Sequence, residues 1–166
     1  MTFDGVDDYA QFNNIIPNSS FSFSLWVKFF NFSGAKPVLD FGNFGNGNQG
    51  GTLSLNGNSL YFAINSDFLT SGQLLALNWM LVSVVVEKNL SYKFKLYINN
   101  LQVNEKTTSI NTITNNPQYI TLAKNIYSSY IRFTYAQIPI VQIYNRALTV
   151  AEIQQNFDAR KTRFGL

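Results

Sequence analysis

The chain carries nine carboxylates, and their spacing decides which acid–base chemistry it could perform. Hydrolysis of a glycosidic bond requires two carboxyl groups that flank the scissile bond, one as the acid and the other as the nucleophile or base. No strand-like segment carries such a pair, and only the first three carboxylates cluster: Asp4, Asp7, Asp8, Asp40, Asp67, Glu87, Glu105, Glu152 and Asp158. We therefore expect that the protein is not an enzyme.

The chain contains no Cys and no His. This composition excludes disulfide bonds, thiol nucleophiles, thiolate or imidazole metal ligands and Ser-His-Asp catalysis. No cofactor is expected.

The three clustered carboxylates, Asp4, Asp7 and Asp8, admit two interpretations. They could form part of a calcium site, although Ca²⁺ prefers about six to eight oxygen ligands. Alternatively they stabilise a turn, because Asp next to Gly accepts local backbone N–H groups, as Asp4-Gly5 could. The ligand count favours the turn, so we predict no metal site.

Two loops carry aromatic rings beside amides, the combination that stacks on sugar faces and binds sugar hydroxyls. One loop is rich in Gly and Asn, and the other follows Ile126. The candidate ligand- or partner-binding residues are Asn43, Phe44, Asn46, Asn48, Tyr127 and Tyr130. Loop packing or a protein interface would use the same aromatic residues, and we favour that interpretation over sugar binding.

The net charge is only +3, and the basic residues are scattered along the chain, so we expect no nucleic-acid partner. The most apolar run, Met80 to Val86, has the length of a strand, so we expect no membrane span. From Phe41 to Val86, Asp67 is the only charged residue. This depletion of charge is typical of the centre of a protein interface. Ordinary sandwich strands joined by polar loops also contain few charged residues, so an interface and an ordinary surface both stay open.

Alternation with a period of two predicts strands with one buried and one solvated face at 21–29 and 92–98. Asn56-Gly57-Asn58 predicts a tight hairpin. Asn99-Asn100 predicts a second hairpin, with Asn100 in the left-handed conformation. Further strands are expected near 9–12, 38–41, 79–87, 119–122, 131–135 and 138–144, with Pro139 at an edge or bulge.

The C-terminal region contains a complete helix-start signal. Thr149 and Glu152 have the spacing of a capping box, and Leu148 and Ile153 that of a hydrophobic staple. We predict one short helix near 150–158. We assign Arg146, which precedes the cap, to a structural ion pair or carbonyl contact.

These motifs together resemble the laminin-G-like, concanavalin A-like lectin/glucanase domains. The resemblance rests on Phe3-Asp4-Gly5-Val6-Asp7-Asp8-Tyr9, Phe21 to Lys28, Asn78-Trp79, Leu96 to Asn100 and Ile143 to Ile153. It implies one domain over 1–166, an all-β jelly-roll sandwich of two antiparallel sheets that is usually non-catalytic and often binds glycans or proteins. The Glu-x-Asp-x-x-Glu pattern of the family's hydrolases is absent. Trp26 and Trp79 match positions that pack inside the sandwich in the family.

The last residues, Gln154 to Ala159 and Arg163 to Leu166, resemble the version of this domain in bacteriophage virion proteins. That resemblance implies a non-enzymatic virion protein, a capsid decoration or fibre-like subunit, which docks on capsid or other virion proteins. Such a protein would be made in the host cytoplasm without a signal peptide. The alternative is a carbohydrate-binding adhesion module for host or environmental polysaccharide. A homo-oligomer remains open in either case.

Overall fold

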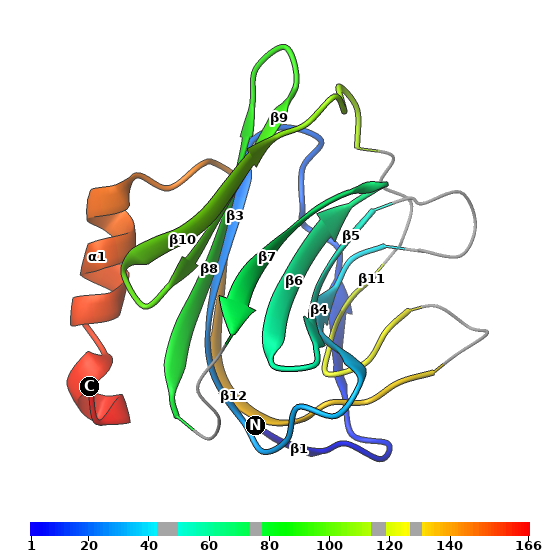
Figure 1. The fold of residues 1–166 in the computed structure, drawn as a ribbon, viewed down its shortest axis with the longest axis vertical. Helices are drawn as coiled ribbons and strands as arrows, with labels where there is room; N and C mark the ends of the chain where they lie inside the picture. Colours follow the sequence, from blue (N-terminus) through cyan, green and yellow to red (C-terminus); the bar gives the residue numbers. More distant parts are fainter. Residues whose placement is uncertain (43–49, 74–77, 114–118, 127–130) are drawn as a thin grey trace.

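The computed structural model describes residues 1–42, 50–73, 78–113, 119–126 and 131–166. Two six-stranded antiparallel sheets pack face to face, and a short helix lies against the outer face of one of them (Figure 1). The prediction of an all-β sandwich with one C-terminal helix is confirmed.

Each sheet joins strands that are distant in the sequence. The first sheet has the order β1 (Thr2–Asp4), β12 (Tyr135–Tyr144), β3 (Phe21–Phe29), β8 (Met80–Lys88), β9 (Tyr92–Ile98) and β10 (Leu101–Thr107). The second has the order β2 (Ala10–Asn13), β11 (Tyr119–Leu122), β4 (Ala35–Asp40), β5 (Gly51–Asn56), β6 (Ser59–Ile64) and β7 (Asp67–Gln73).

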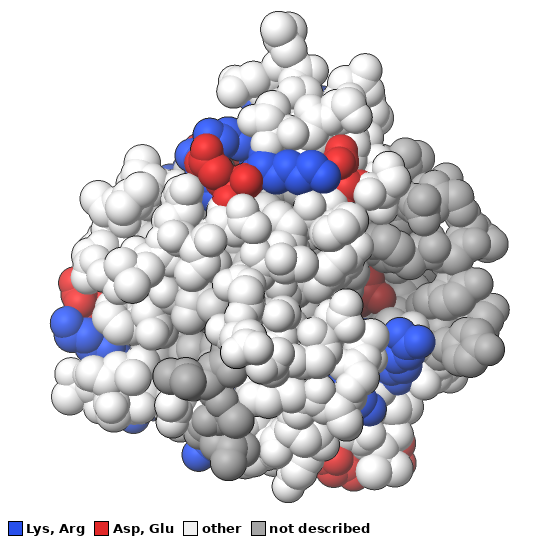
Figure 2. Space-filling model, in the orientation of Figure 1, with Lys and Arg blue, Asp and Glu red and all other residues white. Residues whose placement is uncertain are grey.

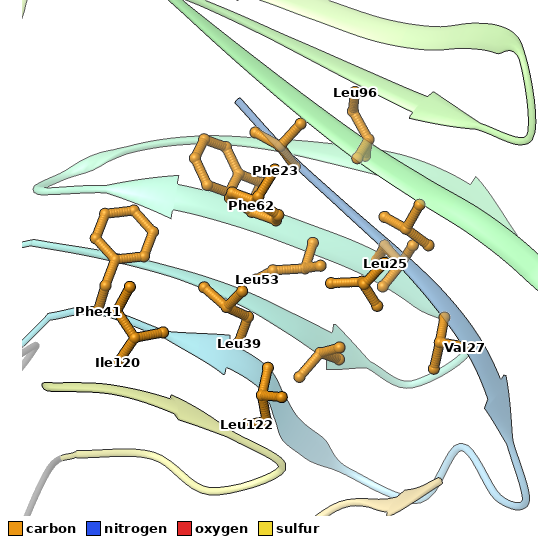
Figure 3. Close-up of a cluster of buried hydrophobic side chains, with 14 of the residues drawn as sticks. Phe23, Leu25, Val27, Leu39, Phe41, Leu53, Phe62, Leu96, Ile120 and Leu122 are labelled. Carbon is orange, nitrogen blue, oxygen red and sulfur yellow. The ribbon is translucent and has the colours of Figure 1, made fainter. Parts of the chain in front are cut away.

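The main core lies between the two sheets. Alternate residues of β3, such as Phe23 and Leu25, point toward Leu53 of β5 and Phe62 of β6 (Figure 3). The rings of Phe23 and Phe62 meet edge to face, with their centroids 5.9 Å apart. Burial of such side chains removes apolar surface from water and is the main force that holds the sheets together.

The opposite face of β3 is covered, which contradicts the expected solvated face. Ser22 lies beneath the chain that leads into α1 (Val150–Asp158): its hydroxyl donates to the carbonyl of Arg146 and accepts from the N–H of Leu148. Ser24 shares a hydrogen bond with Ser83 of β8. Because these hydroxyls are satisfied, small polar residues can occupy a buried sheet face.

The predicted place of Trp26 is wrong in the same way. Its indole is fully buried, but on the outer face of the first sheet and not between the sheets. It stacks on Phe157 of α1 and on Phe164 of the 3-10 helix η1 (Lys161–Phe164), with centroid distances of 5.9 and 4.2 Å. The C-terminal segment therefore forms the cover that the alternating pattern of β3 did not reveal.

Both predicted hairpins are present. Gly57 adopts a φ of 60° between β5 and β6. In the second hairpin, Asn99 and not Asn100 is left-handed, with a φ of 59°. Asn99 is held there because its N–H donates to the carbonyl of Leu81 and its side-chain oxygen accepts from the N–H of Leu81.

The predicted strand at 131–135 is also wrong, because only an isolated bridge between Phe133 and Lys124 forms before β12 begins at Tyr135. Pro139 lies at the predicted bulge, where the register of β12 against β3 shifts between Gln137 and Ile140. Two strands, β1 and β7, were not predicted from the sequence.

The helix start is confirmed in detail. The Thr149 hydroxyl accepts from the N–H of Glu152, and the Glu152 carboxylate accepts from the N–H of Thr149. Arg146 forms the expected ion pair, with both terminal nitrogens donating to Glu152. Among the described residues, no helix has the length and apolar character to cross a bilayer.

Candidate functional site

The predicted loop residues lie outside the residues that the structure describes. These are Asn43, Phe44, Asn46, Asn48, Tyr127 and Tyr130. Their proposed role in binding therefore stays a prediction.

The described ends of the two loops meet at Asp40. Its carboxylate accepts from the N–H of Gly42 at 3.2 Å and from that of Ile126 at 2.9 Å. Asp40 is buried, and burial raises the pKa of its carboxyl from 3.8 to about 7, although the Ile126 and Gly42 donors act in the opposite direction. One side chain thus joins the two segments that the sequence singled out.

The acidic cluster near the N-terminus forms a hydrogen-bonded turn, as predicted. The Asp4 carboxylate accepts from the N–H groups of Val6 and Asp7, and the Asp8 carboxylate accepts from the N–H of Asp4. The Val6 donor holds the pKa of Asp4 below its ordinary value. One oxygen from each of the three carboxylates lies within 4.8 Å of the others, but the observed contacts are those of a turn.

The remaining carboxylates are engaged in ion pairs. The pairs are Glu105–Lys93, Glu87–Lys95, Asp67–Lys106, Glu152–Arg146 and Asp158–Lys161. Figure 2 shows a mixed band of acidic and basic side chains near its top, above a broad area that carries no charge.

A pocket of about 310 Å³ opens on the outer face of the first sheet, beside the C-terminal segment. Its polar and aromatic side chains come from four parts of the chain. It is lined by Met1, Thr2, Trp79, Gln137, Pro139, Arg163 and Phe164. Two aromatic rings with amide, hydroxyl and guanidinium groups around them form a surface on which a flat polar ring can stack and be hydrogen-bonded.

The sandwich and the C-terminal segment position the aromatic walls. Trp79 directly precedes β8 and is half-buried, so its predicted place inside the core is wrong. Its ring lies 4.7 Å from that of Phe164, at an interplanar angle of 48°. Phe164 in turn rests on the buried Trp26. Gly165, with a φ of 75°, ends η1 directly after this ring.

The polar wall comes from neighbouring strands. Gln137 of β12 pairs with Thr2 of β1 and with Lys28 of β3, so all three side chains share the outer face. The Gln137 amide donates to the Thr2 hydroxyl at 3.3 Å. The bulge after Gln137 shifts β12 at this point, which brings Pro139 into the lining.

Three residues of the pocket were not predicted as site residues: Gln137, Arg163 and Phe164. One signal was available: Trp26 stands on the polar face of an alternating strand, so a large aromatic ring there needed a cover. Phe157 and Phe164 are the only Phe residues after the last strand and provide that cover. Nothing in the sequence placed Gln137 beside Trp79.

Comparison with known proteins identifies the class. The sequence profile of the concanavalin A-like lectin/glucanases superfamily matches residues 4–154. The chain therefore belongs to this superfamily, as the two antiparallel sheets also indicate. No curated protein matches the chain in sequence.

The fold is shared with parts of larger proteins. The botulinum neurotoxin serotype C1 binding domain matches with a TM-score of 0.65 and 18% identity, over 85% of this chain and 36% of that one. The binding domain of botulinum neurotoxin DC in complex with SialylT matches with a TM-score of 0.67 and 15% identity, over 91% of this chain and 39% of that one. A mutant of Trypanosoma rangeli sialidase matches with a TM-score of 0.71 and 15% identity, over 87% of this chain and 23% of that one. The chain thus spans well under half the length of these proteins.

Proposed function

We propose that the protein is a carbohydrate-binding module and that its pocket beside the C-terminal segment holds a sugar ring. The observation that carries this proposal is that the paired rings of Trp79 and Phe164 line one pocket together with Gln137 and Arg163. Aromatic faces pack against the apolar face of a sugar, while amide and guanidinium N–H groups donate to its oxygens. The arrangement suits a ring with hydroxyls at its edge.

The comparisons support the same function. The superfamily is one of lectins and glucanases. Among proteins with this fold, a botulinum neurotoxin type C is described as dependent on two ganglioside molecules for cell entry. At identities of 15 to 18%, these neighbours share the fold of this chain, and binding experiments identify its sugar.

We propose a binding role without catalysis. Five of the nine carboxylates are held in ion pairs with Lys or Arg, and Asp40 is buried at the loop base. The remaining three are the turn carboxylates at the N-terminus. None of the described residues that line the pocket is acidic, whereas glycoside hydrolysis requires two carboxyl groups at the sugar.

A glycan array with the purified chain tests the proposal. The wild type is expected to bind at least one glycan, and Trp79→Ala is expected to weaken that binding about tenfold or more, which corresponds to about 1.4 kcal/mol. Phe68→Ala is the matched control, because Phe68 is an exposed ring on the other sheet, stacked on Tyr61. Equal losses in both variants, or no binding by the wild type, would contradict the proposal.

Attachment to a virus particle is the second candidate function. The broad uncharged area in Figure 2 favours it, because interface centres are depleted of charged residues. A docked domain could serve as a capsid decoration and still present the sugar pocket outward. Electron microscopy of purified particles from the source would show density for the domain on a capsid or tail lattice if this second proposal holds, and none if it fails.

A further inference from the structure

The charge beside the pocket is positive and uncompensated. Arg163 lines the pocket, and Lys28 faces Gln137 across neighbouring strands. Within the described part of the chain, no carboxylate lies within ion-pair distance of either cation. By contrast, Lys161 is paired with Asp158 only a few residues from Arg163.

Arg163 is also held beside the aromatic wall. It is exposed, and its guanidinium carbon lies 5.7 Å from the centroid of the Phe164 ring. Its backbone N–H donates to the carbonyl of Arg160, which keeps the residue within η1. The guanidinium group therefore lies over the Phe164 ring within the pocket lining, and no described residue accepts a hydrogen bond from it.

We propose that the pocket is selective for an acidic sugar, with its ring against Trp79 and Phe164 and its carboxylate on the guanidinium of Arg163. This inference rests on the proposed sugar-binding function and adds the chemical class of the ligand. A planar guanidinium donates two parallel hydrogen bonds to a carboxylate, which a neutral hydroxyl cannot accept in the same way. Lys28 adds a second positive charge on the same face of the sheet.

The pocket size agrees with this assignment. A volume of about 310 Å³ lies at the lower end of the range for small-molecule sites, which is about 300 to 1,000 Å³. It can receive one or two sugar rings.

The test compares sugars that differ only in charge. The probes are paired methyl glycosides and short glycans: glucuronide with glucoside, galacturonide with galactoside, and sialyllactose with the carboxamide of the same sialyllactose. A sulfated galactoside is added to distinguish carboxylate from sulfate. Binding is measured by calorimetry at low and at physiological salt, because an exposed guanidinium is screened within about 8 Å at 0.15 M salt.

The acidic member of at least one pair is expected to bind about tenfold more tightly than its neutral partner. Arg163→Gln should remove this preference while the residual binding matches that of the neutral sugar, and Arg163→Lys should restore only part of it. Arg132→Gln is the matched control, since it removes the same charge from an exposed position that does not line the pocket.

The outcomes separate the two proposals. If acidic and neutral members bind equally and Trp79→Ala abolishes both, the sugar site stands and the acidic preference is wrong. If only the sulfated probe binds, the carboxylate assignment is wrong. If no probe binds the wild type although the glycan array shows a ligand, the acidic preference is wrong and the sugar site stands. If the array shows no ligand either, the proposed function fails, and the inference fails with it. Loss of preference in Arg132→Gln as well would show a long-range charge effect and overturn the role of Arg163.

Discussion

Replacement of Asp40 by Asn should stabilise the protein relative to the wild type progressively as the pH rises from 4 to about 7. Asp40 is buried and joins two loop ends through the N–H groups of Gly42 and Ile126. Burial raises the pKa of its carboxyl from 3.8 to about 7. Because the folded state binds the proton more tightly than the unfolded state, protonation of Asp40 favours folding.

The magnitude follows from the two pKa values. One unit of pKa corresponds to about 1.36 kcal/mol, so the interval from 3.8 to about 7 corresponds to about 4 kcal/mol. The stabilisation that the protonated Asp40 contributes to the wild type is fully present below pH 3.8 and is lost as the pH rises toward 7. The amide of the variant does not ionise, so the free energy of unfolding of Asp40→Asn relative to wild type should rise by about 2 kcal/mol at pH 5.4 and about 4 kcal/mol at pH 8.

Urea unfolding of both proteins between pH 4 and pH 8 measures this difference. Any change in hydrogen bonding caused by the amide adds a constant that does not depend on pH. Asp158→Asn is the control of opposite sign, because Lys161 holds the pKa of Asp158 below its ordinary value, so this variant should lose stability relative to wild type as the pH rises. A difference for Asp40→Asn that does not rise between pH 4 and pH 8 would show that the two N–H donors outweigh burial.

Four further substitutions, at three positions, test the packing of the fold. The indole N–H of the buried Trp26 has no acceptor among the described residues, so Trp26→Phe should change the free energy of unfolding by less than about 1 kcal/mol, whereas Trp26→Ala should cost about 3 to 5 kcal/mol. Thr149→Ala should cost about 1 kcal/mol through the lost cap, measurable by urea unfolding. Gly50→Ala should destabilise the fold by more than about 1 kcal/mol and lower Tm, because φ is 80° and a Cβ would lie 2.3 Å from the Cα of Gly42. Equal costs for the two Trp26 variants, or a neutral Gly50→Ala, would contradict these contacts.

Local patterns accounted for most of the elements. Period-two alternation located β3 and β9, and Gly57 located a hairpin, because strand and turn geometry depend on residues close in the chain. The capping box at Thr149 and Glu152 is equally local, and the helix begins where it predicts. The second hairpin shows the limit: Asn99 takes the left-handed conformation because of two hydrogen bonds to Leu81, which is distant in sequence.

The candidate site could not be read from the sequence in the same way. The predicted binding residues were chosen for their aromatic and amide side chains, and they lie outside the described residues. The pocket instead combines Gln137, Trp79 and Phe164, whose proximity depends on strand order and on how the C-terminal segment crosses the sheet. The residues adjacent in sequence do not determine where the C-terminal segment crosses the sheet.

By itself, the sequence determined the all-β class, the positions of most strands, the capped helix and the absence of Cys and His chemistry. These properties follow from composition and from interactions over a few residues. Only the tertiary structure decided that the polar face of β3 is buried, that Trp26 lies under Phe164 and not in the main core, and that Arg163 stands beside an aromatic pocket. Those facts depend on contacts between segments far apart in the chain, which form only when the sheets assemble and the C-terminal segment folds back over them.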